Sequence, residues 1–183
     1  MKMQVTRDTI DKEIEQYLRQ LEGVYPAVSR ILEANRTNPY ALLESVKREP
    51  LHVEPYQNVS LFELANRAAS DLILLFGVRS LFRERVFPFE SYELTLGTEH
   101  GDDISADTGG KTLSGEAFNV AQSFFQTKRS TVLKKFKQVG SSYKVMMFNS
   151  DAINDPSRYH GHEHGDVMQW VVNVTQLLVQ RRS

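Results

Sequence analysis

The chain contains no cysteine. This absence excludes disulfides, cysteine-ligated zinc, iron–sulfur clusters and cysteine nucleophiles. Long apolar runs are also missing, because the stretch Leu72–Phe76 is far too short to span a bilayer. The opening residues Met1–Gln4 lack the apolar core of a signal peptide, and we therefore expect a cytoplasmic protein without a membrane segment.

Charge of either sign is not in excess, since 22 Lys and Arg residues stand against 23 Asp and Glu residues. Hydrophobic residues make up 40% of the 183 residues, which is typical of globular proteins. The length corresponds to one domain on the usual scale of roughly 100–200 residues. We expect a helical region over residues 1–50 that packs on a core over residues 60–183.

The spacing of apolar residues predicts the secondary structure. We expect helices over residues 6–22, 25–35, 39–48, 60–76, 121–137 and 166–180, and extended segments over residues 86–89, 92–96, 103–107, 111–120 and 143–148. Gly77 should end the helix over 60–76, and residues 49–59, which hold two prolines, should form a linker. This order predicts an α+β fold in which helices cover a small mixed sheet.

The charges are distributed unevenly along the chain. Residues 90–116 carry seven acids and one base, whereas residues 117–150 carry six bases and no acid. Clustered carboxylates bind hard divalent cations, and a basic helix beside them can hold phosphates. The pattern therefore predicts a metal-dependent site for a polyanion, although charge runs are more commonly two solvated faces of opposite sign.

Two of the acids should meet across a hairpin. If the turn centres on Gly109, Asp103 lies opposite Gly115 and next to Glu116. A one-residue bulge would then bring the two carboxylates to one ion. Two oxygen donors suit Mg²⁺, with Mn²⁺ as the alternative, because Mg²⁺ takes one or two carboxylates and keeps several waters.

Lys128 interrupts the apolar stripe of the helix over 121–137. At about 100° per residue it falls among the apolar residues of that stripe, which are Ala121, Phe124, Phe125, Val132 and Phe136. An unpaired ammonium is costly to bury, so a nearby carboxylate–metal centre would explain its position. The other interpretation is that Lys128 extends past the phenylalanines to solvent.

Asp103, followed after twelve residues by Glu116-Ala117-Phe118, resembles the motif of the PD-(D/E)XK nuclease superfamily, which includes many restriction endonucleases. The resemblance covers about residues 60–150 and implies a core of a helix, a β-meander, a helix and a strand. Phe118 departs from it, because the family has lysine there; in some members this lysine comes from the following helix, as Lys128 would here. The family often adds an acid from the first core helix, for which Glu63 and Asp71 are the candidates.

The resemblance implies a Mg²⁺-dependent DNA endonuclease, for example one of the restriction type. Asp103 and Glu116 would hold the metal, and Lys128 would orient water or stabilise the transition state. The bases expected to contact DNA phosphates are Arg129, Lys134, Lys135 and Lys137. A homodimer formed through the N-terminal helices would cut both strands, and an inactive relative is implied if Lys128 does not reach the site.

His160, His162 and His164 alternate along a short polar segment. Imidazoles at this spacing can bind Zn²⁺ or Ni²⁺, which would indicate a metal-binding hydrolase or a non-catalytic interaction protein. Glu99 and His100 could join such a cluster. The competing interpretation is a flexible polar loop.

Overall fold

The computed structural model describes residues 1–97 and 101–182, with side chains up to residue 179. The helices are α1 (Ile10–Gln20), α2 (Val24–Ala34), α3 (Pro39–Arg48), α4 (Leu61–Glu84), α5 (Phe125–Phe136) and α6 (Val174–Arg182), with short 3₁₀ turns at Leu21–Gly23, Gln122–Phe124, Ser150–Ala152 and Pro156–Arg158. The strands are β1 (Lys2–Thr6), β2 (Leu51–Val53), β3 (Tyr56–Val59), β4 (Ser91–Thr95), β5 (Ile104–Thr108), β6 (Lys111–Phe118), β7 (Tyr143–Asn149), β8 (His162–His164) and β9 (Val167–Val172).

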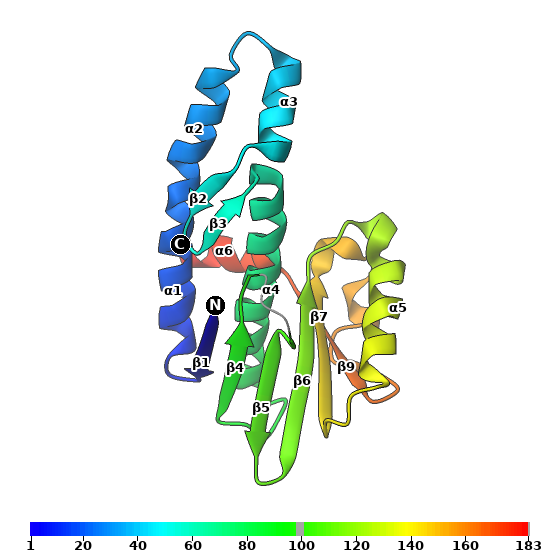
Figure 1. Ribbon diagram of the computed structural model, residues 1–183. Coiled ribbons are helices and arrows are strands. Elements are labelled where there is room, and N and C mark those ends of the chain that lie inside the picture. Colours follow the sequence, from blue (N-terminus) through cyan, green and yellow to red (C-terminus); the bar gives the residue numbers. More distant parts are fainter. Residues whose placement is uncertain (98–100, 183) are drawn as a thin grey trace.

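Within these described residues, seven strands form one mixed sheet in the order β1-β4-β5-β6-β7-β9-β8 (Figure 1). Strands β4, β5 and β6 make an antiparallel meander, and β7 and β9 continue parallel to β6. Strands β1 and β8 close the two edges in antiparallel orientation. The arrangement confirms the predicted α+β class, with a larger sheet than expected.

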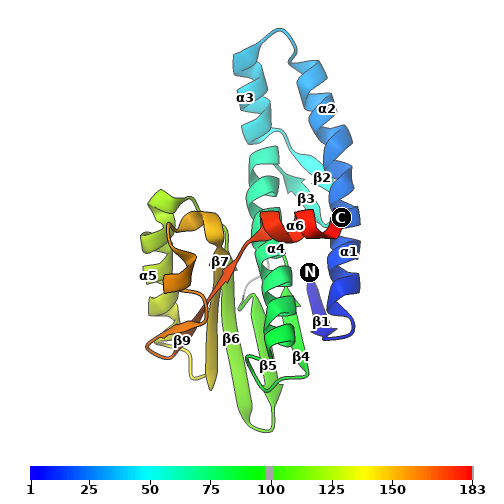
Figure 2. The same cartoon turned by 180° about the vertical axis from the view of Figure 1, so that it is seen from behind.

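Both faces of the sheet are covered, and β7 shows how. Val145 and Met147 point into the core that also holds the buried residues of α4, whereas Met146 and Phe148 join the cluster under α5. Such burial on both faces is typical of a parallel strand with crossover helices. Figure 2 shows α4 lying against one face of the sheet, with α6 crossing α4.

The predicted stop at Gly77 is wrong, because α4 continues to Glu84. A Cβ atom at position 77 would lie 2.5 Å from the sulfur of Met147 on β7. The glycine therefore permits close packing of α4 on the sheet, and the helix ends instead where Arg85 adopts a left-handed backbone with φ 53°.

The predicted helix over 166–180 is also wrong. Residues 167–172 form β9, and α6 begins only at Val174. Val167 is buried in the α5 cluster and Trp170 in the α4 core, so the strand presents apolar side chains to both faces. A strand buried on both sides has no clear alternation, and its valines were spaced by coincidence as in a helix.

The N-terminal part differs from the expectation in two places. The helix predicted over 6–22 is β1 followed by α1, and β1 pairs with β4, so the region over 1–50 contributes a strand to the main sheet. The predicted linker over 49–59 holds the β2–β3 hairpin. Helices α2 and α3 lie where they were predicted and project from the body as a helical arm over residues 24–48 (Figure 1). None of the described helices has the length and apolar character needed to cross a bilayer.

Candidate functional site

The β5–β6 hairpin places the two predicted acids side by side. Its turn is Gly109-Gly110, and both glycines have positive φ, as a tight two-residue turn requires. Ile104 therefore pairs with Gly115, one position away from the expected register. As a result, Asp103 comes next to Glu116, and the register itself does what a one-residue bulge was predicted to do.

Asp103 is held at the start of β5 by backbone bonds to β6. Its N–H donates to the carbonyl oxygen of Gly115 at 3.0 Å, and the N–H of Ala117 donates to its Oδ2 at 2.8 Å. Burial raises the pKa of the Asp103 carboxyl to about 7, although the Ala117 bond opposes the shift. The nearby carboxylates of Glu116 and Asp71 raise it further. Burial is thus the main reason why the Asp103 carboxyl holds its proton more tightly than an exposed aspartate does.

Glu116 has a cationic partner from α5. Its Oε1 contacts the ammonium of Lys135, which also lies 3.1 Å from the carboxylate of Asp102 and 3.3 Å from the carbonyl oxygen of Gly101. The sequence predicted that Lys135 contacts phosphates, but its ammonium pairs with the carboxylates of Asp102 and Glu116. Lys135 follows Lys128 by seven residues, or about two helical turns, so both lysines lie on one face of α5. This spacing could have predicted from the sequence that Lys135 belongs to the site.

A cavity of about 380 Å³ lies between the first half of α4 and the ends of β5 and β6. Asp103, Asp71 and Lys128 all line it, together with Asn66, Arg67, Ser70, Leu74, Gly97, Ala117, Phe118, Asn119 and Val120. The Lys128 ammonium lies 5.6 Å from the centre of the Phe118 ring. Lys128 thus reaches the cavity of Asp103, and its ammonium lies over the ring of Phe118. We call this cavity the acidic pocket.

Asp71 on α4 is the acid that the first core helix supplies to the pocket. It is buried, and burial raises its pKa. It accepts hydrogen bonds from Tyr56 at 2.5 Å, from Tyr17 at 3.4 Å and from the N–H of Gly97 at 3.1 Å. Glu63, the other candidate, pairs instead with Arg67 one helical turn along. The tyrosine contacts join α1 and β3 to the pocket, and no sequence pattern pointed to them.

The other predicted bases are spread along α5. Arg129 donates to the amide oxygen of Gln169 at 2.8 Å and lies over the ring of Tyr159. Lys134 and Lys137 line a separate cavity at the far end of the helix, together with residues 164–167. Arg129, Lys134 and Lys137 do not line the acidic pocket.

The histidine segment does not converge on a common point. His162 and His164 lie exposed on the edge strand β8, while the Nδ1 atom of His160 accepts the N–H of Val171 at 3.2 Å. The ring of His160 also packs on Trp170 at 4.3 Å. Glu99 and His100 lie outside the described residues. Among the residues that are described, no group of three or more His, Asp or Glu side chains is placed to hold a metal ion.

Comparisons with protein-family models, with curated proteins and with solved structures found no match to this chain.

Proposed function

We propose that this chain is a Mg²⁺-dependent DNA endonuclease of the PD-(D/E)XK type, which hydrolyses phosphodiester bonds in the acidic pocket. The observation that carries the proposal is the position of Asp103 beside Glu116, with Lys128 lining the cavity of Asp103. The order α4, β4, β5, β6, α5 and β7 agrees with the helix, meander, helix and strand that the resemblance implies. Such an enzyme would act in the cytoplasm, where DNA is accessible.

The Asp103–Glu116 pair fits a hard divalent cation, with Asp103 in the lining of the acidic pocket and Glu116 directly before Ala117, which also lines it. The pKa of Asp103 is raised to about 7 mainly by burial and further by neighbouring carboxylates, and a cation bound beside it would favour the ionised carboxylate. The donors are carboxylate oxygens, which Mg²⁺ and Mn²⁺ prefer. Because Mg²⁺ keeps several of its waters, two protein carboxylates are enough to hold it.

In this mechanism Asp103 and Glu116 would hold the metal, and the bound ion would lower the pKa of a water and offset charge on the phosphate. Lys128 faces the same cavity and would stabilise the negative charge that develops on the phosphate oxygens. Lys135 keeps Glu116 oriented in the protein without metal. Arg129, Lys134 and Lys137 would contact phosphates outside the pocket, which gives salt-sensitive binding without base recognition.

Incubation with supercoiled plasmid tests the proposal. We expect nicking in Mg²⁺ or Mn²⁺, none in EDTA, and none by the Asp103→Asn variant in any of these conditions. Intact plasmid with the native protein, over several DNA sequences and both metals, would contradict the nuclease function.

Phe118 supports a second candidate, a nuclease-like module that binds DNA without cutting it. The aromatic ring occupies the position of the family's lysine, so catalysis depends on Lys128 alone. Salt-dependent DNA binding with no nicking, unaltered by Lys128→Ala, would favour this alternative.

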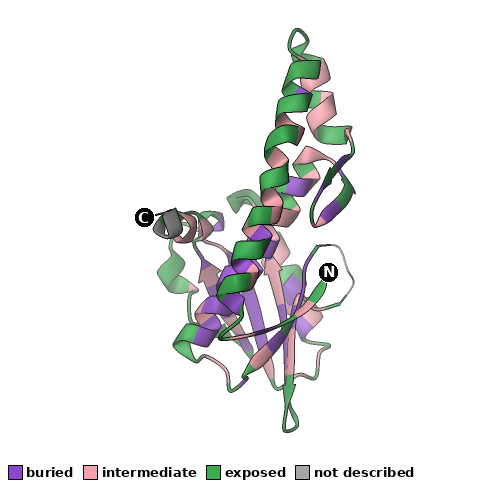
Figure 3. Ribbon diagram, turned by 90° about the vertical axis from the view of Figure 1, so that its left-hand side faces the viewer, coloured by how far each residue is buried: buried purple, intermediate pink, exposed green. Residues whose placement is uncertain are grey.

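We also propose that the helical arm joins two copies of the chain. Figure 3 shows that most of the arm is exposed. The large apolar side chains exposed along it and at the nearby start of α4 are Tyr25, Leu32, Tyr40, Leu43 and Phe62. The arm and its flanking residues, over 21–50, carry four acids and four bases, and two acid–base pairs bond each other, so this region as a whole has no net charge to attract DNA. A neutral apolar face of this kind suits an identical arm, whose acids and bases can pair across a two-fold axis.

A further inference from the structure

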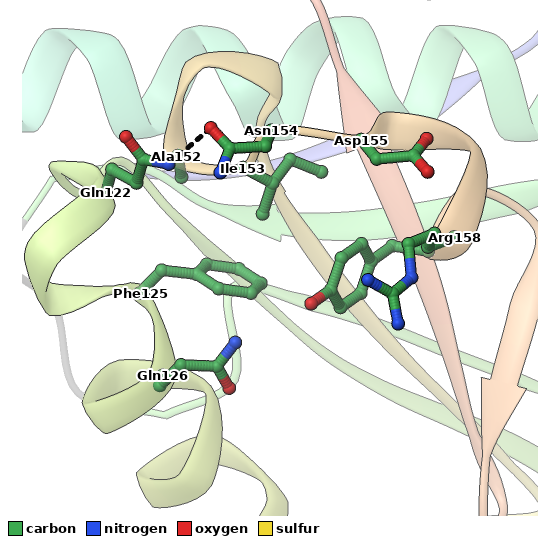
Figure 4. A pocket seen from close by; sticks show the side chains of 9 residues that line it. Gln122, Phe125, Gln126, Ala152, Ile153, Asn154, Asp155 and Arg158 are labelled. Carbon is green, nitrogen blue, oxygen red and sulfur yellow. Dashed lines mark hydrogen bonds between the residues drawn. The ribbon is translucent and has the colours of Figure 1, made fainter.

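Another cavity, of about 170 Å³, lies between the start of α5 and the 3₁₀ segments that follow β7. Figure 4 shows Phe125 and Ile153 pointing into this space, with the side chains of Gln126 and Arg158 on opposite sides of it. The lining residues are Gln122, Phe125, Gln126, Ala152, Ile153, Asn154, Asp155, Arg158 and Tyr159. We call it the amide pocket, because three of its polar side chains are carboxamides.

A continuous group of aromatic rings connects the amide pocket with the acidic pocket. Phe118 lines the acidic pocket and stacks on Phe148 at 5.7 Å. Phe148 contacts Phe125 at 4.9 Å, and Phe125 contacts Tyr159 at 5.4 Å. Phe125 and Tyr159 line the amide pocket. The two pockets therefore lie at the two ends of one aromatic cluster, and the chain from residue 118 to residue 128 borders both.

The amide pocket offers hydrogen bonds that the protein itself leaves unused. Gln122 donates to Asn154 at 2.5 Å, which fixes one side of the opening. Within the described part of the chain, no hydrogen bond or ion pair engages the amide of Gln126 or the guanidinium of Arg158. A carboxamide can donate and accept at once, as the edge of a nucleobase also does. Apolar walls with such groups at the rim suit a flat heterocycle with mixed donors and acceptors.

Phe124 is adjacent in sequence to this pocket and does not itself line it. It directly precedes Phe125, it forms the end of the 3₁₀ turn before α5, and its side chain is 66% exposed. It lies in sequence between two lining residues, Gln122 and Gln126. An exposed aromatic ring next to a nucleic-acid path is a platform on which a base can stack.

We propose that the amide pocket receives one unpaired nucleobase of the DNA strand whose phosphate lies in the acidic pocket, and that Phe124 stacks on that base or its neighbour. The inference rests on the proposed function for the presence of that strand. A base paired within a duplex cannot enter the pocket, so the base comes from single-stranded DNA or from a locally unpaired stretch, such as negative supercoiling opens in a plasmid. Gln126 and Arg158 hydrogen-bond the edge of the base.

Binding in EDTA separates this inference from catalysis, because no cleavage occurs without metal. The full-length protein is titrated into a fluorescent single-stranded oligonucleotide, into its abasic counterpart and into the matching duplex, with fluorescence anisotropy as the readout. We expect the intact single strand to bind more tightly than the abasic strand. Phe124→Ala and Gln126→Ala should weaken binding of the single strand by roughly 5- to 100-fold, as expected for the loss of one stacked base.

Two control variants show whether a loss of DNA binding is specific to the pocket residues. Gln138→Ala removes an exposed amide from the region just after α5 and should leave binding unchanged, while Phe124→Trp should retain it. A 2-aminopurine placed at the bound position should change its fluorescence with the native protein and not with Gln126→Ala. Equal affinity for intact and abasic strands, or native binding by Phe124→Ala, would overturn the inference, even if plasmid cleavage succeeds. Failure of plasmid cleavage alone would count against the nuclease function and leave these binding outcomes to decide the base site.

Discussion

The backbone N–H of Ala117 donates to Oδ2 of Asp103 over 2.8 Å, and this bond fixes the carboxylate next to Glu116 on the neighbouring strand. It uses one carboxylate oxygen and leaves Oδ1 without a hydrogen bond among the described residues. The Asp103 carboxylate is therefore already positioned in the metal-free protein, and this would reduce the entropic cost of the metal binding that we propose.

The stability of the metal-free protein should fall as the pH rises from about 4 to about 7. The pKa of Asp103 is about 7 in the folded protein and 3.8 as the ordinary value, so the folded state holds the proton more tightly in this range. The stabilisation is fully present below the unfolded pKa and is lost as the pH passes the folded pKa. Its size is at most about 4 kcal/mol, from roughly 1.4 kcal/mol per pKa unit.

Urea unfolding in EDTA at pH 5 and pH 8 measures this effect. Asp103→Asn keeps an oxygen acceptor for Ala117 and cannot ionise, so its stability should fall less between the two values. An identical pH dependence of the native protein and the variant would show that the Asp103 proton does not contribute.

Mg²⁺ at millimolar concentration should raise the melting temperature of the native protein at pH 8. The gain follows from binding to the folded state alone and grows with the ratio of metal concentration to Kd. Asp103→Asn and Glu116→Gln each remove a charged ligand and should abolish the shift in a thermal melt. An undiminished shift in both variants would place the metal elsewhere.

Lys128→Ala should reduce cleavage by about 100-fold, the usual effect of removing one electrostatic contact to the transition state. Lys134→Ala is the matched control on the same helix and should change the salt dependence of binding more than the cleavage rate. Single-turnover kinetics separates the two effects. Equal cleavage rates for Lys128→Ala and the native enzyme would remove Lys128 from the mechanism.

Lys135→Ala should lower the Mg²⁺ concentration needed for half-maximal cleavage, because the Lys135 ammonium competes with the metal for Glu116. A metal titration of cleavage with Lys135→Ala and Lys134→Ala side by side tests this. A higher Mg²⁺ requirement in Lys135→Ala would instead show that Lys135 supports the site.

Gly115→Ala should destabilise the protein by about 1–3 kcal/mol and disturb the acidic pocket. A Cβ atom at position 115 would lie 2.4 Å from a methyl group of Ile104 and 2.6 Å from one of Val145. Gly140→Ala is the control, since nothing lies within 4 Å of the Cβ position there. Chemical unfolding compares the two, and equal losses would contradict the steric argument.

The pattern of the sequence was informative where elements are amphipathic or sharply bounded. Asn38-Pro39 defined the start of α3, and the glycine turn with its flanking strands brought Asp103 and Glu116 together. The prediction failed where tertiary packing overrides local signals. Gly77 looked like a helix stop, yet its lack of a side chain serves the contact with Met147. Within the site, Tyr17 and Tyr56 reach Asp71 from distant parts of the chain, which no local spacing could reveal.

These two tyrosines also relate the helical arm to the pocket. Tyr17 lies on α1, which leads into the arm, and Tyr56 lies on β3, by which the chain returns to α4. Their hydroxyl groups bond each other and the same buried carboxylate of Asp71. The hydrogen bonds thus hold the base of the arm on both sides, on α1 before the arm begins and on β3 after it ends. Movement of the helical arm relative to the sheet would have to break these hydrogen bonds first. We therefore expect the arm and the body to move together as one rigid unit.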